Sequence, residues 1–387
     1  MDTSQGSAAP ANRTRLQSYL AREPVLLAAL SLLAVASFLA VTGLSRLFHA
    51  QQASLGQRWF DRGVADLGAQ RYDRAMQEFR AALRYSRDNY LYQLNLAEAL
   101  IGAKRTSEAS AYLLNLWDRQ PENGLVNLDL ARIAAQQGEI EQALRYYHNA
   151  IYATWPSDEE VQRRETRVEL IEFLLRLNAK AQAQSELIAL AANAGEDATQ
   201  QVRIGDLFMR AQDYEHALAA YRVSLRSERH NAAALAGAGS AAFELGQYPT
   251  AYHYLQAAVA SNPRDTESAE RLKTTELVLQ MDPFQRQISV AQRNRLVVRA
   301  FQTAGERLKS CTSAAGSSAS AAQGKLSDSW TKLNPQISER GLQRDPDLVE
   351  SAMHLVSTIE RQTASACGPP SGADQALLLI AKQHEGN

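Results

Sequence analysis

An alanine that recurs in a fixed context constrains the fold of this chain more than any other feature. The six positions are Ala75, Ala109, Ala143, Ala183, Ala217 and Ala251. Four of the five intervals are 34 residues and the third is 40, with the extra residues in the turn-rich stretch 153–160. A period of this length predicts an array of stacked supersecondary units rather than one globular core.

The surroundings of each alanine repeat as well. A large apolar residue follows four positions later, on the same helix face, and a mostly small residue stands twelve positions before. The large residues are Phe79, Leu113, Tyr147, Leu187, Tyr221 and Leu255, and the small set is Gly63, Ala97, Ala131, Ile171, Gly205 and Gly239. Small residues let two antiparallel helices approach, so each period predicts a helix hairpin. The fourth unit, 164–197, departs most, with Ile171 at the small position and Lys180 where other units have an aromatic residue.

This pattern resembles the tetratricopeptide repeat family. The family signature is seen as Trp59, Gly63, Tyr72, Ala75, Phe79 and Ala82, and again as Gly205, Tyr214, Ala217 and Tyr221. The resemblance covers residues 57–265. It implies an all-α fold, a right-handed α-solenoid of about six hairpins. It also implies a protein-binding scaffold without chemistry of its own, whose first helices line a concave groove for a peptide segment or partner helix.

Polar residues on the predicted first helices are the candidates for that groove. They are Asn95, Glu98, Asp129, Arg132, Glu169, Glu172, Arg203, Asp206 and Arg210. Any one of them is equally compatible with an ordinary solvated helix face. A clamp for a terminal carboxylate is not expected, because Phe60 and Val64 occupy its first positions and only Asn95 fits in the next repeat.

An uncharged run of twenty residues, 25–44, precedes the array. As a helix it spans about 30 Å, the thickness of a bilayer's hydrocarbon core. A cleaved secretory signal would have a shorter apolar region and a small-residue cleavage site. We therefore predict a polar leader (1–24), a single transmembrane anchor (25–44) and a linker (45–56). Basic residues flank the run on both sides. We expect a protein of the inner (plasma) membrane with a cytoplasmic N-terminus and the bulk in the periplasm or outside the cell.

The last quarter of the chain predicts a capping helix (266–283) and a small helical region (284–387) with a flexible Ser, Ala and Gly segment (312–324). Cys311 and Cys367 each follow a predicted helix. If three helices run up, down and up, both thiols reach the same end of a small bundle and can form a disulfide. Two unrelated buried thiols are the alternative.

Catalytic and cofactor signals are absent from the sequence. The 41 basic and 42 acidic residues nearly balance, which argues against a nucleic-acid partner. The seven histidines are scattered without ligand spacing, and no phosphate loop or nucleophile motif occurs. We expect no enzyme, cofactor, metal or small-molecule substrate. The leading hypothesis is a membrane-anchored scaffold that binds other proteins in the cell envelope. The alternatives are an assembly or chaperone factor for an envelope biogenesis or secretion complex, and a thiol-redox enzyme in the C-terminal region.

Overall fold

The computed structural model describes residues 13–155, 157–315 and 321–385. Over these ranges the secondary structure is helical, apart from one bridge pairing between Asn123 and Thr154, which confirms the all-α fold class. The helices are α1 (Arg13–Gly68), α2 (Tyr72–Tyr85), α3 (Tyr90–Gly102), α4 (Thr106–Arg119), α5 (Gly124–Gln137), α6 (Ile140–Ile151), α7 (Glu159–Arg176), α8 (Lys180–Ala192), α9 (Ala198–Arg210), α10 (Tyr214–Ser227), α11 (Ala232–Glu244), α12 (Tyr248–Ser261), α13 (Thr266–Met281), α14 (Val290–Ala315), α15 (Ala321–Leu333), α16 (Glu339–Arg344), α17 (Asp347–Cys367) and α18 (Gly372–Glu385). The chain forms two compact units, Met1–Thr166 and Arg167–Asn387, and α7 begins in the first and ends in the second.

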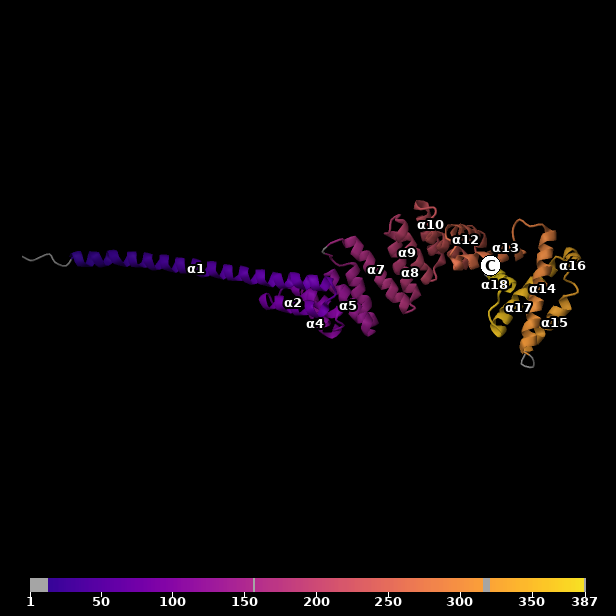
Figure 1. Cartoon of the computed structure of the whole chain (residues 1–387), viewed down its shortest axis with the longest axis horizontal. Helices are drawn as coiled ribbons and strands as arrows, with labels where there is room; N and C mark the ends of the chain where they lie inside the picture. The colour runs from indigo at the N-terminus through magenta and orange to yellow at the C-terminus, as the bar shows by residue number, and fades with distance from the viewer. Residues whose placement is uncertain (1–12, 156, 316–320, 386–387) are drawn as a thin grey trace, which may run out of the picture. The chain divides into compact units, whose positions relative to one another are not determined.

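Helix α1 is a single uninterrupted helix that contains both the apolar run and the predicted linker 45–56 (Figure 1). No break separates the predicted anchor from the first repeat, since the same helix continues to Gly68 and packs on α2. Of the predicted leader, residues 1–12 lie outside the described ranges. The apolar side chains of the run are exposed, with Leu32 at 71%. By length and composition, this helix can cross a membrane.

Close contact between paired helices explains the small residues of the repeat. The six recurring alanines are all 0% exposed. A Cβ atom added to Gly63 would lie 2.5 Å from the Phe79 ring, and one added to Gly205 would lie 2.6 Å from the Tyr221 ring. A larger side chain at either position would therefore force the two helices of the hairpin apart.

The turns inside the hairpins repeat as regularly as the helices. In every repeat, the residue five positions before the recurring alanine has a left-handed backbone. The φ angles are +57° at Gln70, +61° at Lys104, +77° at Gly138, +56° at Asn178, +59° at Gln212 and +69° at Gly246. Only two of these six residues are glycine, the residue that adopts this conformation without strain.

Polar contacts support the irregular fourth hairpin. The Arg167 guanidinium on α7 lies 3.2 Å from a carboxylate oxygen of Glu186 on α8. The Lys180 ammonium, at the position where other units have an aromatic residue, donates to the side-chain oxygen of Gln212 at 2.6 Å. The fourth hairpin therefore substitutes charged contacts for part of the apolar packing of the other repeats.

Thr154 and Trp155, in the stretch that holds the extra residues between the third and fourth repeats, pack on the start of α5. Thr154 pairs with Glu122 and Gly124 through backbone hydrogen bonds of 2.9 and 3.0 Å. The buried Trp155 ring covers Gly124, and its indole N–H donates to the carbonyl of Ala150 at 3.0 Å. This stretch is thus a packed part of the first unit.

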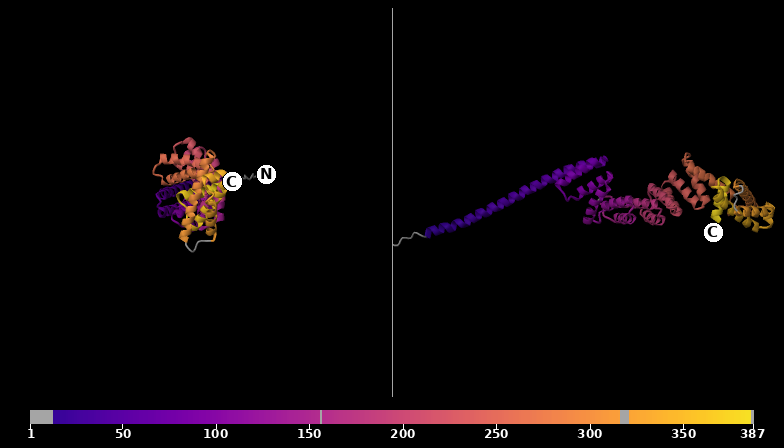
Figure 2. Two further views of the ribbon diagram at one scale, coloured as in Figure 1. Left: turned by 90° about the vertical axis from the view of Figure 1, so that its right-hand side faces the viewer. Right: turned by 90° about the horizontal axis from the view of Figure 1, so that it is seen from below.

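Helices α14 to α18 form a bundle at the C-terminal end of the second unit, orange to yellow in Figure 2. Its apolar core is continuous with α12 and α13, because Tyr248, Val278 and Met281 belong to the same buried cluster as Phe301 and Leu377. Helix α13 packs on α12, the last helix of the sixth hairpin, and on α18. Both ends of the predicted flexible segment are helical, since α14 extends to Ala315 and α15 begins at Ala321; residues 316–320 lie outside the described ranges.

Candidate functional site

In the first unit, four of the predicted groove residues lie on neighbouring first helices. Asn95 and Glu98 are on α3, and Asp129 and Arg132 are on α5. The Arg132 guanidinium lies 3.4 Å from a carboxylate oxygen of Asp129. Burial raises the pKa of Glu98, and the charge of Arg132 opposes that shift. The fold thus places Glu98 within electrostatic range of Arg132, a proximity that their separation in sequence does not reveal.

Asn95 is less available for binding than the sequence indicates. Its side-chain amide donates to the carbonyl of Leu91 at 2.9 Å within the same helix. Asp129 is buried, whereas Asn95, Glu98 and Arg132 are half-buried. The surface that these four residues offer is therefore polar, of mixed charge and partly recessed.

In the second unit the predicted residues lie on α7 and α9. Glu169 and Glu172 are half-buried on α7, while Arg203, Asp206 and Arg210 are exposed on α9. The Tyr221 hydroxyl donates to Asp206 at 2.6 Å. Burial, this hydrogen bond and the Asp206 charge all raise the pKa of Tyr221 far above its ordinary value.

Helix α9 is amphipathic, with one buried apolar side and one exposed charged side. Ile204, Leu207 and Phe208 are buried against neighbouring helices, and the charged residues between them face outward. Because Tyr221 both fills the gap left by Gly205 and holds the Asp206 carboxylate, hairpin packing fixes one of the exposed charges.

Cys311 and Cys367 form a disulfide, with their Cα atoms 5.8 Å apart. This confirms the disulfide and excludes the alternative of two unrelated thiols. Cys311 lies near the end of α14 and Cys367 is the last residue of α17, so the bond joins two long helices of the bundle.

A buried ionic cluster beside this disulfide was not predicted. The Arg307 guanidinium on α14 lies 3.5 Å from Glu360 on α17 and 3.6 Å from Asp374 on α18. Burial and the charge of Asp374 raise the pKa of Glu360 to about 8, while Arg307 lowers it. A signal was present in the sequence, because Glu360 continues the apolar face formed by Val349, Ala352, Met353, Val356 and Ile359.

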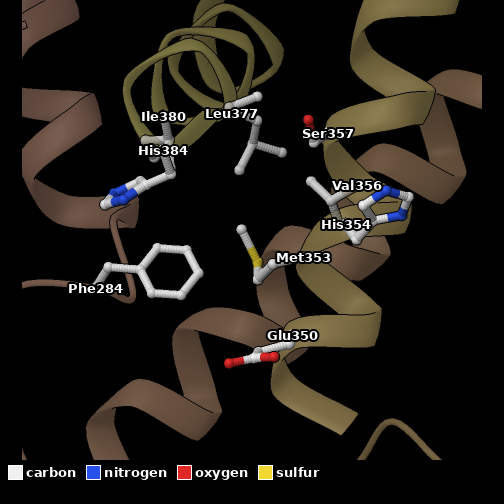
Figure 3. A pocket seen from close by; sticks show the side chains of 10 residues that line it. Phe284, Glu350, Met353, His354, Val356, Ser357, Leu377, Ile380 and His384 are labelled. Carbon is white, nitrogen blue, oxygen red and sulfur yellow. The ribbon is translucent and has the colours of Figure 1, made fainter. Parts of the chain in front are cut away.

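A pocket of about 190 Å³ opens between α17, α18 and the turn after α13 (Figure 3). Its floor is apolar, with Met353, Val356, Leu377 and Ile380 among the lining residues. At the rim, the Phe284 and His384 rings lie 4.5 Å apart, and His384 is 3.6 Å from the Asp282 carboxylate. The pocket offers room for one apolar side chain.

Within the described ranges, no group of three His, Cys, Asp or Glu side chains is placed to hold a metal ion. The two charged surfaces on the first helices and the apolar pocket are suited to non-covalent binding of protein segments.

Comparisons with known proteins bear on the repeat region. Residues 66–122 match the sequence profile of the tetratricopeptide repeat family. No curated protein matches the chain.

Similar solved structures include the C-terminal part of a tetratricopeptide repeat-containing protein from Cytophaga hutchinsonii, which is 9% identical over 80% of this chain and 98% of that one, with a TM-score of 0.43. The Pseudomonas aeruginosa protein pilF is 17% identical over 57% of this chain and 97% of that one, with a TM-score of 0.39. YrrB, described as a TPR protein with an unusual peptide-binding site, is 14% identical over 49% of this chain and 95% of that one, with a TM-score of 0.39.

The family profile covers the end of α1, all of α2 and the whole second hairpin, α3 and α4. The recurring buried alanines and the left-handed turns repeat in all six hairpins, and glycine packs on an aromatic ring at the small position of the first and the fifth. Residues 66–122 therefore carry the tetratricopeptide repeat pattern, and they lie within a longer array of helix hairpins.

Proposed function

We propose that this protein is a membrane-anchored scaffold that binds partner proteins through the charged faces of its first helices. The observation that carries the proposal is the two-faced helix α9, which presents Arg203, Asp206 and Arg210 outward from a buried apolar side. Glu98 and Arg132 form the corresponding polar surface of the first unit. Such surfaces give specificity through charge, and neighbouring apolar side chains add affinity.

The continuous helix α1 supports a role at the membrane. Its apolar run is exposed and long enough to span a bilayer, and the same helix forms the first hairpin with α2. The array would therefore stand close to the membrane surface, where it meets membrane-bound partners more often than soluble ones.

The Cys311–Cys367 disulfide supports an array on the outer side of the inner membrane. Disulfides persist in oxidising compartments and are rare in the cytosol. In spheroplasts, where the outer face of the inner membrane is accessible, a membrane-impermeant protease should then degrade the array and leave the N-terminal leader protected; the reverse pattern would place the array in the cytoplasm.

Site-specific photo-crosslinking in native membranes tests the binding surface. A photoreactive amino acid at position 206 on α9 should capture a defined partner, and one at position 222 on α10 of the same hairpin should not. The double substitution Arg203→Glu and Arg210→Glu should abolish capture from position 206. Arg222→Glu with Arg226→Glu is the matched control, because it makes the same charge change on the exposed face of α10.

Equal capture by the two double variants would refute the assignment of the binding surface. The identity of the captured protein separates a general scaffold from an assembly factor. A component of one biogenesis or secretion complex would favour the assembly factor, whereas several unrelated envelope proteins would favour the scaffold.

A further inference from the structure

The two sulfur atoms of the disulfide lie in different surroundings. Cys311 is buried on α14, with 4% of its surface exposed. Cys367 is exposed at the end of α17, immediately before the turn 368–371. A thiolate approaching from solvent therefore reaches the sulfur of Cys367 much more readily than that of Cys311.

The surroundings of Cys311 also suit it as the leaving group. The buried side-chain amide of Gln323 on α15 donates to the Cys311 sulfur at 3.5 Å. Arg307 lies one helical turn before Cys311, is largely buried and lines the same hollow as the disulfide. An N–H donor at the sulfur favours a thiolate over a thiol, and a better-stabilised thiolate leaves faster.

The hollow gives an incoming group room beside Cys367. Its volume is about 470 Å³, and both cysteines line it together with Thr303, Ser310 and Asp374. Arg307 donates to the carbonyl of Gly368 at 2.9 Å, so it holds the backbone next to Cys367. The exposed residue Cys367 is thus held at the edge of an open polar hollow.

We propose that Cys367 is a site of thiol–disulfide exchange, attacked by the thiolate of a dithiol oxidoreductase, with Cys311 as the leaving group. The attacking sulfur forms a new bond to the sulfur of Cys367. The bond between Cys367 and Cys311 breaks, and its electron pair leaves on Cys311 as a thiolate. The second thiol of the oxidoreductase then attacks the mixed disulfide, which releases reduced Cys367 and oxidised reductant. This site is independent of the binding surface on the first helices.

Trapping the mixed disulfide tests the direction of attack. The full-length protein in detergent is mixed with a thioredoxin variant that lacks its resolving cysteine, and a parallel sample receives reduced glutathione. Both reactions are quenched with acid, and the remaining thiols are alkylated. Peptide mass spectrometry should find thioredoxin and glutathione on Cys367 and the alkyl group on Cys311, with at least a tenfold excess over the reverse pattern. Equal labelling, labelling mainly on Cys311, or no mixed disulfide in either sample would overturn the proposal. A mixed disulfide of Cys367 with glutathione but not with thioredoxin would rule out a protein dithiol as the attacking group.

Gln323→Leu tests the leaving group. The variant should be reduced several-fold more slowly by dithiothreitol, with the mixed disulfide still on Cys367. The matched control is Gln302→Leu on the exposed face of α14, which should react at the wild-type rate. An unchanged rate in Gln323→Leu, with an unchanged thermal midpoint, would reject the role of this amide.

Discussion

The left-handed turns of the hairpins allow a quantitative test of how this array is stabilised. Gln70 and Lys104 occupy these turns with φ angles of +57° and +61°, where a side chain is strained and glycine is not. An L-residue in this conformation costs about 1–2 kcal/mol. Substitution by glycine relieves this strain, but it also makes the unfolded chain more flexible, which offsets the relief by about 0.4–1 kcal/mol. Gln70→Gly and Lys104→Gly should each stabilise the protein by roughly 0.5–1 kcal/mol.

The side chains of Gln70 and Lys104 are exposed, so their removal should cost little packing. Gln212 has the same backbone conformation but accepts a hydrogen bond from Lys180, so the loss of its side chain would offset the relief of strain. The two substitutions lie in successive hairpins, and together they should add about 1–2 kcal/mol if their effects are independent.

The assay is thermal unfolding of the full-length protein in detergent, followed by circular dichroism at a helix-sensitive wavelength. Each kcal/mol corresponds to a shift of about 2–4 °C for a unit of 150–250 residues. Hydrogen exchange resolved by peptide locates the effect, because peptides from α2 and α3 should exchange more slowly in the variants than in the wild type.

Two alanine substitutions provide the matched comparison. Gly138→Ala places a side chain at a φ of +77° and should destabilise the protein by about 1–2 kcal/mol. Gly68→Ala, at the end of α1, meets nothing within 4 Å and should be neutral or slightly stabilising. Backbone strain at these turns would be contradicted if the glycine variants melted at or below the wild-type temperature, or if the two alanine variants had the same stability.

Three further outcomes follow from the packing and the charges. Glu360→Gln should flatten the pH dependence of stability. The pKa of Glu360 is about 8 in the folded state and near 4.5 in the unfolded state, so the folded state binds more protons and the wild type loses stability as the pH rises from about 5 through 8. Thermal melting of both proteins across that pH range would show the difference. Gly205→Ala should cost about 1–3 kcal/mol in denaturant titrations, because its Cβ would collide with the Tyr221 ring, whereas Gly324→Ala meets nothing within 4 Å; similar costs for both would contradict this. Cys367→Ser should remove about 4 kcal/mol by loop-closure entropy over the 56-residue separation, and an unchanged melting temperature would show that the bond contributes little.

The repeat architecture could be predicted because its determinants are local and recur. The spacing of Ala75, Phe79 and Ala82 places them on one helix face, and the same spacing in the next period does the same for its own helix. Each hairpin contacts mainly its neighbours, so a pattern visible in one period suffices to place the helices of that period.

The exposure of the groove residues could not be predicted from the sequence, because it depends on how the neighbouring helix packs. Asp129 and Arg203 occupy similar positions in the sequence pattern, yet the first is buried and the second is exposed. The predicted linker 45–56 lies within helix α1, because its polar residues are compatible with a continuing helix and α1 packs on α2.

By itself, the sequence determined the helical class, the repeat period, the apolar N-terminal run and the positions of the small and large residues in each hairpin. Tertiary structure alone decided that Arg307 lies between Glu360 and Asp374, and that Cys367 is exposed while Cys311 is buried beside Gln323. The physical reason is the separation in sequence. Contacts within a hairpin follow from helical geometry, whereas those across the C-terminal bundle join residues far apart in sequence, such as Arg307 and Asp374, and depend on how several helices pack together.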